Sequence, residues 1–299
     1  MKIGIIGAGS MGCVFAWMMK NAGHDITLYD SDPHTVNSIG EGLNVYYDNQ
    51  ITTLLLKIYN EPSVLKTCEI VFLFVKSYST RSAMSECVPF LGNDCIVVSL
   101  QNGIGNMEII QSFISPELIV FGTTSIGAYK TSASNVRIGG MGETVIGGAR
   151  DASVRVVYES LTAAGIRVSI VPDPDTAVWR KAIVNAGINP LGALFRIPNG
   201  KILESEHLRT VQEMIVREAV LIARLHGLEF DVKDMIAFVQ NVCQRTSANR
   251  CSMLQDIENN RVTEIDSING YLIRIAGEKN IDVPYNKTVY SFIKYLEKR

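Results

Sequence analysis

The sequence has few of the features that mark metal-binding, disulfide-rich or membrane proteins. Its six cysteines include no Cys-x-x-Cys pair and its four histidines form no cluster, so neither a zinc site nor a disulfide framework is expected. Free thiols fit a reducing cytoplasm. The apolar run Ile70 to Val75 is far shorter than the roughly 20 residues that cross a bilayer. We therefore expect a cytoplasmic protein with no metal and no membrane contact.

An excess of basic residues is also missing. The 28 Lys and Arg and the 30 Asp and Glu give a net charge of −2, so nucleic acid is not an expected partner. The first apolar segment is interrupted by Gly4, Gly7 and Gly9, unlike a secretory signal, and export is not expected. The 299 residues, 47% of them apolar, predict a globular chain of about two domains.

The first half alternates short β-branched runs with helical patterns, which is typical of an α/β fold with a doubly wound parallel sheet. Several runs lack a polar face, as strands buried on both sides do. The segment Pro172 to Asp175 breaks this pattern, and the periodicity beyond it is helical. We predict an N-terminal domain at 1–172 and an all-helical C-terminal domain at 173–299. The candidate strands are Lys2 to Ile6, Asp25 to Tyr29, Ile70 to Val75, Cys95 to Ser99 and Ile119 to Gly122.

Three helices stand out in the second half. Apolar residues recur at spacings of three and four from Leu208 to Leu225, and Gly227 would form a left-handed cap. A similar stripe runs from Ile265 to Ile275 before Gly277, and Pro284 could sit in the first turn of a last helix.

A Gly-x-Gly-x-x-Gly motif lies between the first predicted strand and a helix, at Gly7, Ala8, Gly9, Ser10, Met11 and Gly12. The first glycine permits a tight turn, the second lets the backbone approach a pyrophosphate, and the third lets helix and strand pack closely. A plain glycine-rich turn is the alternative. The position of the motif, with an acidic residue at the end of the next strand, favours a dinucleotide.

That acidic residue is Asp30, which follows the second predicted strand. A carboxylate there can accept hydrogen bonds from the adenosine ribose and should repel a 2′-phosphate. Ser31 and Asp32 follow, with no adjacent cation, so NAD(H) is favoured and NADP(H) remains the alternative. Asp30 could also simply form a turn.

Lys76 and Asn102 follow the third and fourth predicted strands. The carboxyl ends of parallel strands are where open α/β sheets bind ligands. A solvated lysine and an Asn-Gly turn explain the same residues about as well.

A polar stripe of Lys181, Asn185 and Asn189 lies within an apolar segment of the second half. A spacing of four residues puts these side chains on one helix face. Once buried they need hydrogen-bond partners, which a polar ligand could supply, although a solvated face is the alternative. Pro190 clashes with the carbonyl of Ala186, so the helix is expected to kink or end near Asn189.

Two kinds of titratable residue remain. Glu264 stands at the expected start of a helix at Thr263 to Asp266 and lies outside the apolar stripe, so it could be a surface carboxylate or a functional one. The histidines, at 24, 34, 207 and 226, lie in turns or at helix ends, which disfavours a histidine-based dehydrogenase.

Taken in order, these motifs resemble those of the ketopantoate reductase family over essentially the whole chain. The resemblance rests on the glycine motif, Val75-Lys76, Leu100 to Asn106, Trp179-Arg180-Lys181 with Asn185 and Asn189-Pro190-Leu191, Pro198-Asn199-Gly200, Ser252 to Asp256, and Arg261 to Gly270.

The resemblance implies a Rossmann domain followed by a helical domain, with a 2-oxo acid bound between them. It implies that Lys181 donates a proton to the developing alkoxide and that Glu264 lies beside it, both as catalytic residues. The cofactor contacts would include Lys76, Asn102 and Glu264, and the substrate contacts would be Asn102, Lys181, Asn185, Asn189, Asn199 and Ser252.

The segment Asn249-Arg250-Cys251 departs from the family, which often has small hydroxyl residues there. The Arg250 guanidinium could pair with a substrate carboxylate, or it could exclude the hydroxymethyl end of pantoate. Asn249 and Arg250 are therefore candidate substrate contacts.

The resemblance implies NAD(P)H-dependent reduction of 2-dehydropantoate to (R)-pantoate, a step of pantothenate synthesis, and a homodimer is plausible. The alternatives are a D-2-hydroxyacid dehydrogenase of the same family, of the D-mandelate type, and a protein that binds or senses the nicotinamide without chemistry.

Overall fold

The computed structural model describes residues 1–298, which form two compact units. The first contains residues 1–101 and 106–177, and the second contains residues 102–105 and the described residues from 178 to 298. The chain passes from the first to the second between Ala177 and Val178, five residues after the boundary expected from the sequence. The short segment Asn102–Gly105 belongs to the second unit although it lies far earlier in the chain.

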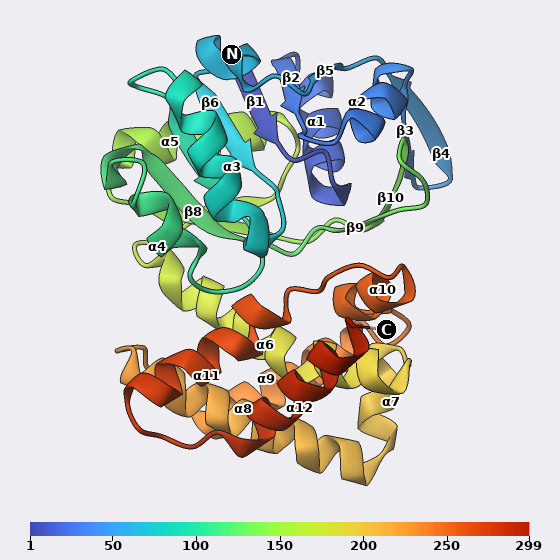
Figure 1. The fold of residues 1–299 in the computed structure, drawn as a ribbon, viewed down its shortest axis with the longest axis vertical. Helices are drawn as coiled ribbons and strands as arrows, with labels where there is room; N and C mark the ends of the chain where they lie inside the picture. Colours follow the sequence, from blue (N-terminus) through green and yellow to red (C-terminus); the bar gives the residue numbers. More distant parts are fainter. Residues whose placement is uncertain (299) are drawn as a thin grey trace. The chain divides into compact units, whose positions relative to one another are not determined.

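The first unit is built on an eight-stranded sheet in the order β12-β11-β8-β7-β6-β1-β2-β5 (Figure 1). Neighbouring strands are parallel except β8 and β11. The predicted doubly wound parallel sheet is confirmed. The strands are β1 (Lys2–Ile6), β2 (Asp25–Tyr29), β5 (Lys57–Tyr59), β6 (Ile70–Leu73), β7 (Ile96–Ser99), β8 (Ile119–Thr124), β11 (Thr144–Gly148) and β12 (Val168–Ile170).

Helices cover both faces of this sheet. One face packs against α1 and α5 through side chains such as Phe15 and Val157, and the other packs against α3 and α4 through Met84 and Ile110. The central strands are therefore apolar on both sides. The helices of this unit are α1 (Ser10–Asn21), α2 (Pro33–Gly40), α3 (Thr80–Cys87), α4 (Asn106–Gln111) and α5 (Asp151–Ala163), with 3₁₀ turns η1 (Pro62–Thr67), η2 (Ser77–Ser79), η3 (Val88–Phe90) and η4 (Pro116–Leu118).

A second sheet of four strands, in the order β4-β3-β10-β9, was not predicted. Its strands are β3 (Leu43–Tyr47), β4 (Gln50–Leu54), β9 (Gly127–Lys130) and β10 (Asn135–Gly140). The strands of the β3–β4 hairpin are joined by Asp48 and Asn49, both at positive φ, as a two-residue hairpin turn requires. Four of the five residues of β4 are exposed, so this strand has no apolar alternation that would reveal it.

The regular elements of the second unit are all helices or 3₁₀ turns among its described residues. Its elements are α6 (Pro174–Phe195), which begins in the first unit, α7 (Asn199–Glu204), α8 (Glu206–Leu225), α9 (Val232–Arg245), α10 (Ser252–Glu258), the 3₁₀ turn η5 (Ile265–Ser267), α11 (Asn269–Glu278) and α12 (Pro284–Leu296). The predicted α8 is confirmed, with Gly227 just beyond it at a φ of +90°.

One local prediction in this unit is wrong, and another is narrowed to a single alternative. Residues 263–266 do not begin a helix, because Ile265–Ser267 is a separate 3₁₀ turn and α11 starts only at Asn269. The stripe before Gly277 belongs to α11, which includes Gly277 and ends at Glu278. Of the two alternatives expected at Pro190, an end of the helix near Asn189 is excluded, because α6 continues through Pro190 to Phe195. Leu191 and Ala193 of this last part are buried in the core, and a kink stays a prediction.

Candidate active site

The glycine loop of the first unit has the geometry that dinucleotide binding needs. Gly7 has a φ of +95°, and a Cβ atom there would lie 2.9 Å from the backbone nitrogen of Val75. A Cβ on Gly12 would lie 1.9 Å from the Gly7 carbonyl oxygen. Gly9, by contrast, is exposed, and no heavy atom of the described chain lies within 4 Å of a Cβ built on it. The backbone at Gly9 is thus open to a ligand at the start of α1.

Asp30 lies at the end of β2 beside this loop. Its Oδ2 accepts a 2.7 Å hydrogen bond from the Ala8 amide, and its Oδ1 accepts one of 3.0 Å from the Asp32 amide. Asp32 in turn caps α2 by accepting from the amides of His34 and Thr35. Asp30 therefore forms a turn and also borders the glycine loop, so the two interpretations of this residue are compatible.

A buried polar chain joins the ends of β6 and β7, which are the strands that precede Lys76 and Asn102. The Gln101 amide donates to the Val75 carbonyl at 2.8 Å and to the Thr80 hydroxyl at 2.9 Å. Its oxygen accepts from Ser99, and Thr80 donates to Asn106. The sequence indicates Gln101 and Asn106 only as members of the motif Leu100 to Asn106, without a role for either. Their buried hydrogen bonds hold the carboxyl edge of the sheet in one geometry.

In the second unit, the polar stripe of α6 is confirmed as one helix face. Lys181 and Asn185 are partly buried and Asn189 is buried. Burial lowers the pKa of the Lys181 amine from 10.5 to about 8, although the negative charge of Glu264 acts in the opposite direction. A lysine with this pKa holds its proton at neutral pH and can release it to a developing alkoxide.

Glu264 is buried and contacts the segment 102–105. The Asn102 amide donates to Glu264 Oε2 at 3.3 Å, and the Ile104 amide donates to the Ser267 carbonyl at 2.8 Å. Gly103 has a φ of +85°, and a Cβ there would lie 2.4 Å from Ser267 Oγ. Asn102 and Glu264, which are 162 residues apart, thus lie together because a glycine lets the two backbones approach closely.

Three of the proposed substrate contacts, Asn199, Arg250 and Ser252, lie at helix starts or in loops. Asn199 is buried and donates to Thr246 Oγ1 at 2.9 Å, while its Oδ1 has no hydrogen-bond partner among residues 1–298. Ser252 is the first residue of α10 and is exposed. Arg250 is exposed and forms an ion pair with Glu258 of α10, so part of its charge is already balanced within the protein.

Asn249 is joined to Asn199 through its backbone. Asn249 is exposed, and its carbonyl accepts from the Asn199 amide at 2.9 Å. Its neighbour Cys251 is buried and links α10 to α6, because Sγ accepts from the Leu254 amide and the thiol donates to the Asn189 carbonyl at 3.5 Å.

Buried amides support α6 where Pro190 breaks its hydrogen bonding. Pro190 has no amide to offer the Ala186 carbonyl, and Asn269 Nδ2 donates to that carbonyl instead, at 3.4 Å. Gln212 Nε2 donates to the next carbonyl, that of Gly187, at 3.3 Å. Sequence reasoning missed both amides, although a proline inside a helix is a signal that such partners are needed.

No helix within residues 1–298 is long and apolar enough to span a membrane. Within the same residues, no three His, Cys, Asp or Glu side chains are grouped so that they could hold a metal ion.

The glycine loop in one unit and the Lys181 and Glu264 pair in the other define an oxidoreductase of the dinucleotide-binding class. The family model described as "Ketopantoate reductase PanE/ApbA" matches residues 3–151, and that described as "Ketopantoate reductase PanE/ApbA C terminal" matches residues 173–297. The chain therefore belongs to the ketopantoate reductase family, as predicted.

Individual relatives agree with this assignment. The 2-dehydropantoate 2-reductase of Pyrococcus horikoshii is 34% identical over 99% of this chain and 98% of its own length. A ketopantoate reductase of this family from Ralstonia eutropha superposes with a TM-score of 0.92 and is 27% identical, covering 100% of this chain and 99% of its own. A D-mandelate dehydrogenase with NADH and anilino(oxo)acetate superposes with a TM-score of 0.95 at 26% identity and the same coverage.

Proposed function

We propose that this protein reduces the C2 ketone of 2-dehydropantoate to (R)-pantoate, a step of pantothenate and coenzyme A synthesis. The observation that carries the proposal is the partly buried Lys181, whose pKa is lowered to about 8 by burial and on which the negative charge of Glu264 acts. Relatives named 2-dehydropantoate 2-reductase match the whole chain, which supports this substrate.

The roles of the second-unit residues follow from their chemistry. Hydride addition to a ketone leaves negative charge on its oxygen, which the Lys181 ammonium stabilises before it donates its proton. Glu264 keeps that amine protonated, and the Asn102 amide, held by Glu264, offers a hydrogen bond to a ligand. Asn185, Asn189, Asn199 and Ser252 offer further hydrogen-bonding groups to the 2-oxo acid.

The first unit fits a nicotinamide dinucleotide, which supplies the hydride when bound. The open backbone at Gly9 and the start of α1 suit the pyrophosphate. Asp30 would accept hydrogen bonds from the adenosine ribose, which favours NAD(H) over NADP(H). Lys76 follows β6 and is a further candidate cofactor contact. We also expect a cytoplasmic protein that forms a homodimer. Light scattering of the purified protein tests whether it is a dimer.

A D-2-hydroxyacid dehydrogenase of the D-mandelate type is the second candidate. The superposition on D-mandelate dehydrogenase supports it. So does the presence of Arg250, since a guanidinium at this position of the family motif would exclude the hydroxymethyl end of pantoate if it entered the site.

A kinetic panel separates these functions. We expect kcat/KM to be highest for 2-dehydropantoate with NADH when it is compared with phenylglyoxylate and branched 2-oxo acids, each with NADH and NADPH. Lys181→Met should lower kcat by about 10² to 10⁴, and Lys287→Met, an exposed lysine of α12, is the control. A higher value on phenylglyoxylate would favour the second candidate. Cofactor binding without turnover of any 2-oxo acid would indicate a nicotinamide-sensing protein.

A further inference from the structure

The segment that carries Glu264 has little regular structure of its own. Residues 259–263 form a turn and an irregular stretch, and Glu264 itself precedes the short 3₁₀ turn η5. Within the segment, Ser267 donates to the Glu264 carbonyl from its amide at 3.1 Å and from its hydroxyl at 3.0 Å. These bonds shape the turn, but they do not anchor it to a helix.

The anchor comes from three residues of α12 and its C-terminal cap, Tyr290, Lys294 and Glu297, which we call the α12 clamp. Glu297 Oε1 accepts from both the amide and the hydroxyl of Thr263, at 2.8 and 2.7 Å. Lys294 bridges Glu297 Oε2 at 2.7 Å and Asp266 Oδ2 at 2.9 Å. The Tyr290 hydroxyl donates to Asp266 Oδ1 at 2.7 Å. The clamp thus holds the residues on both sides of Glu264.

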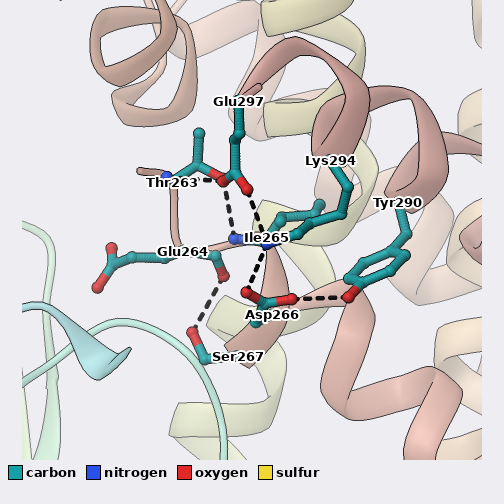
Figure 2. A network of polar contacts seen from close by, with 8 residues as sticks. All are labelled: Thr263, Glu264, Ile265, Asp266, Ser267, Tyr290, Lys294 and Glu297. Atoms are coloured by element: carbon teal, nitrogen blue, oxygen red, sulfur yellow. Dashed lines mark hydrogen bonds and ion pairs between the residues drawn. The ribbon is translucent and has the colours of Figure 1, made fainter. Parts of the chain in front are cut away.

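The direction of the Glu264 side chain shows what this arrangement accomplishes. In Figure 2 the clamp lies on one side of the segment, and the Glu264 carboxylate points away from it. That carboxylate accepts from Asn102, and its charge acts on Lys181. The α12 clamp thus fixes the backbone around Glu264 from one side of the segment, and the Glu264 carboxylate extends from the opposite side.

The clamp also has the physical character of a rigid support. The Glu297 side chain is only 6% exposed, and a buried carboxylate is costly unless it is paired and hydrogen-bonded. Its contacts with Thr263 and Lys294 satisfy it, and the Thr263 hydroxyl that it orients accepts in turn from the Ile265 amide at 3.2 Å. Functional side chains need such support, because displacements of about 1 Å can cost about 10²-fold in rate.

We propose that the α12 clamp positions Glu264 for the reaction, with Glu297 as the principal positioning residue. This inference rests on the proposed function, because Glu264 matters only if it acts beside Lys181. It assigns to the C-terminal helix a role in catalysis in addition to its packing through Val289 and Ile293.

The test compares Glu297→Ala and Glu297→Gln with Glu264→Gln in the full-length protein. For each we would measure kcat and KM for 2-dehydropantoate from neutral to alkaline pH, the Kd for NADH, and the thermal midpoint. We expect Glu297→Ala to lower kcat about 10- to 100-fold with an unchanged Kd for NADH. The alkaline limb of its profile of kcat against pH should move to lower pH, as in Glu264→Gln, because the Glu264 charge that keeps Lys181 protonated is displaced. Glu297→Gln retains an acceptor for Thr263 and should fall between Glu297→Ala and the wild type.

Asp282→Asn is the matched control, because it removes an exposed ion pair with Lys287 at the other end of α12. A Glu297→Ala variant that melts earlier but keeps its kcat and its alkaline limb would overturn the proposal. If Glu297→Ala does not fold, Thr263→Ser and Thr263→Val test the proposal instead. The serine variant should keep the wild-type kcat and alkaline limb, and the valine variant should lose both. Equal kcat values and limbs in the two variants would overturn the proposal. If Glu264→Gln itself changes neither kcat nor the limb, it is the proposed function that fails.

Discussion

At the scale of single residues, Lys181 carries the most specific chemical expectation. Its amine must be protonated to act as the acid in reduction, and its pKa in the folded protein is about 8. As the pH rises through this value, the amine loses its proton. The reductive kcat should therefore be highest at neutral pH and fall about tenfold per pH unit above the pKa, whereas oxidation of the hydroxy acid should rise over the same range.

Profiles of kcat against pH in both directions measure this effect. Glu264→Gln removes the charge that raises the pKa of Lys181, so its alkaline limb should lie at lower pH. An alkaline limb near 10.5, the ordinary pKa of lysine, would contradict the assignment of Lys181 as the proton donor. A shift of that limb to higher pH in Glu264→Gln would contradict it as well.

Gly103 provides a second residue-scale prediction. In Gly103→Ala, the new Cβ meets Ser267 Oγ at 2.4 Å, and the residue keeps a positive φ. We expect a loss of about 1–3 kcal/mol in the free energy of unfolding, together with a lower kcat because Asn102 moves with the backbone. Denaturant unfolding and steady-state kinetics measure the two effects.

Gly277→Ala is the matched control for this substitution. Gly277 lies within α11, and a Cβ there has no described neighbour within 4 Å. Alanine in a helix is favoured over glycine by about 0.5–1 kcal/mol, so this variant should be as stable as the wild type or more stable. If Gly103→Ala and Gly277→Ala changed the free energy of unfolding equally, the close approach of Ser267 would not explain why position 103 needs glycine.

At the scale of elements, α6 depends on a buried network that replaces the hydrogen bonds lost at Pro190. Asn269 Nδ2 also donates to Asn286 Oδ1 at 2.9 Å, and Asn286 Nδ2 donates to Glu218 at 2.7 Å. The chain of contacts therefore joins α6, α11, α12 and α8, with Asn269 and Asn286 fully buried. Buried hydrogen bonds of this kind are stronger than exposed ones, because the protein interior has a low dielectric constant.

We expect Asn269→Ala to destabilise the protein by about 1–3 kcal/mol, because the carbonyl of Ala186 and the amide oxygen of Asn286 lose a donor. The KM for the 2-oxo acid should rise, since Asn185 and Asn189 flank the disturbed turn of α6. Thermal unfolding and substrate titrations test both expectations. Asn241→Ala, at an exposed position of α9, should change neither quantity.

At the scale of the whole molecule, Asp30 and Lys181 belong to different compact units, which makes the expected effects of their variants separable. Asp30→Ala removes the carboxylate that would accept from the ribose, a charged interaction of about 1.5–3 kcal/mol. The KM for NADH should therefore rise about 10- to 100-fold and the preference for NADH over NADPH should narrow.

The alkaline limb serves as the internal control for Asp30→Ala. The charge that acts on Lys181 belongs to Glu264, in its own unit, so the limb should stay in place while the KM for NADH changes. A wild-type protein that already prefers NADPH would refute the role given to Asp30.

Local chemistry made much of this molecule predictable. Periodicity predicts the apolar strands β1, β2, β6, β7 and β8, the helix α8, and the four-residue spacing of Lys181, Asn185 and Asn189. The backbone freedom of glycine explains the glycine motif. These features depend on neighbours within a few residues. Their recognition was enough to predict the fold class and the family.

Tertiary structure decided the features that depend on distant contacts. The four-stranded sheet joins segments some 90 residues apart, and its exposed strand β4 has no pattern of its own. The segment 102–105 belongs to the second unit because Gly103 lets it approach Ser267. By sequence, Glu264 could be a surface or a functional carboxylate. In the folded chain it is buried and accepts a hydrogen bond from Asn102, while α12 holds the neighbouring Thr263. Hydrogen bonds between residues far apart in the chain leave no periodic trace in the sequence, so only the folded chain reveals them.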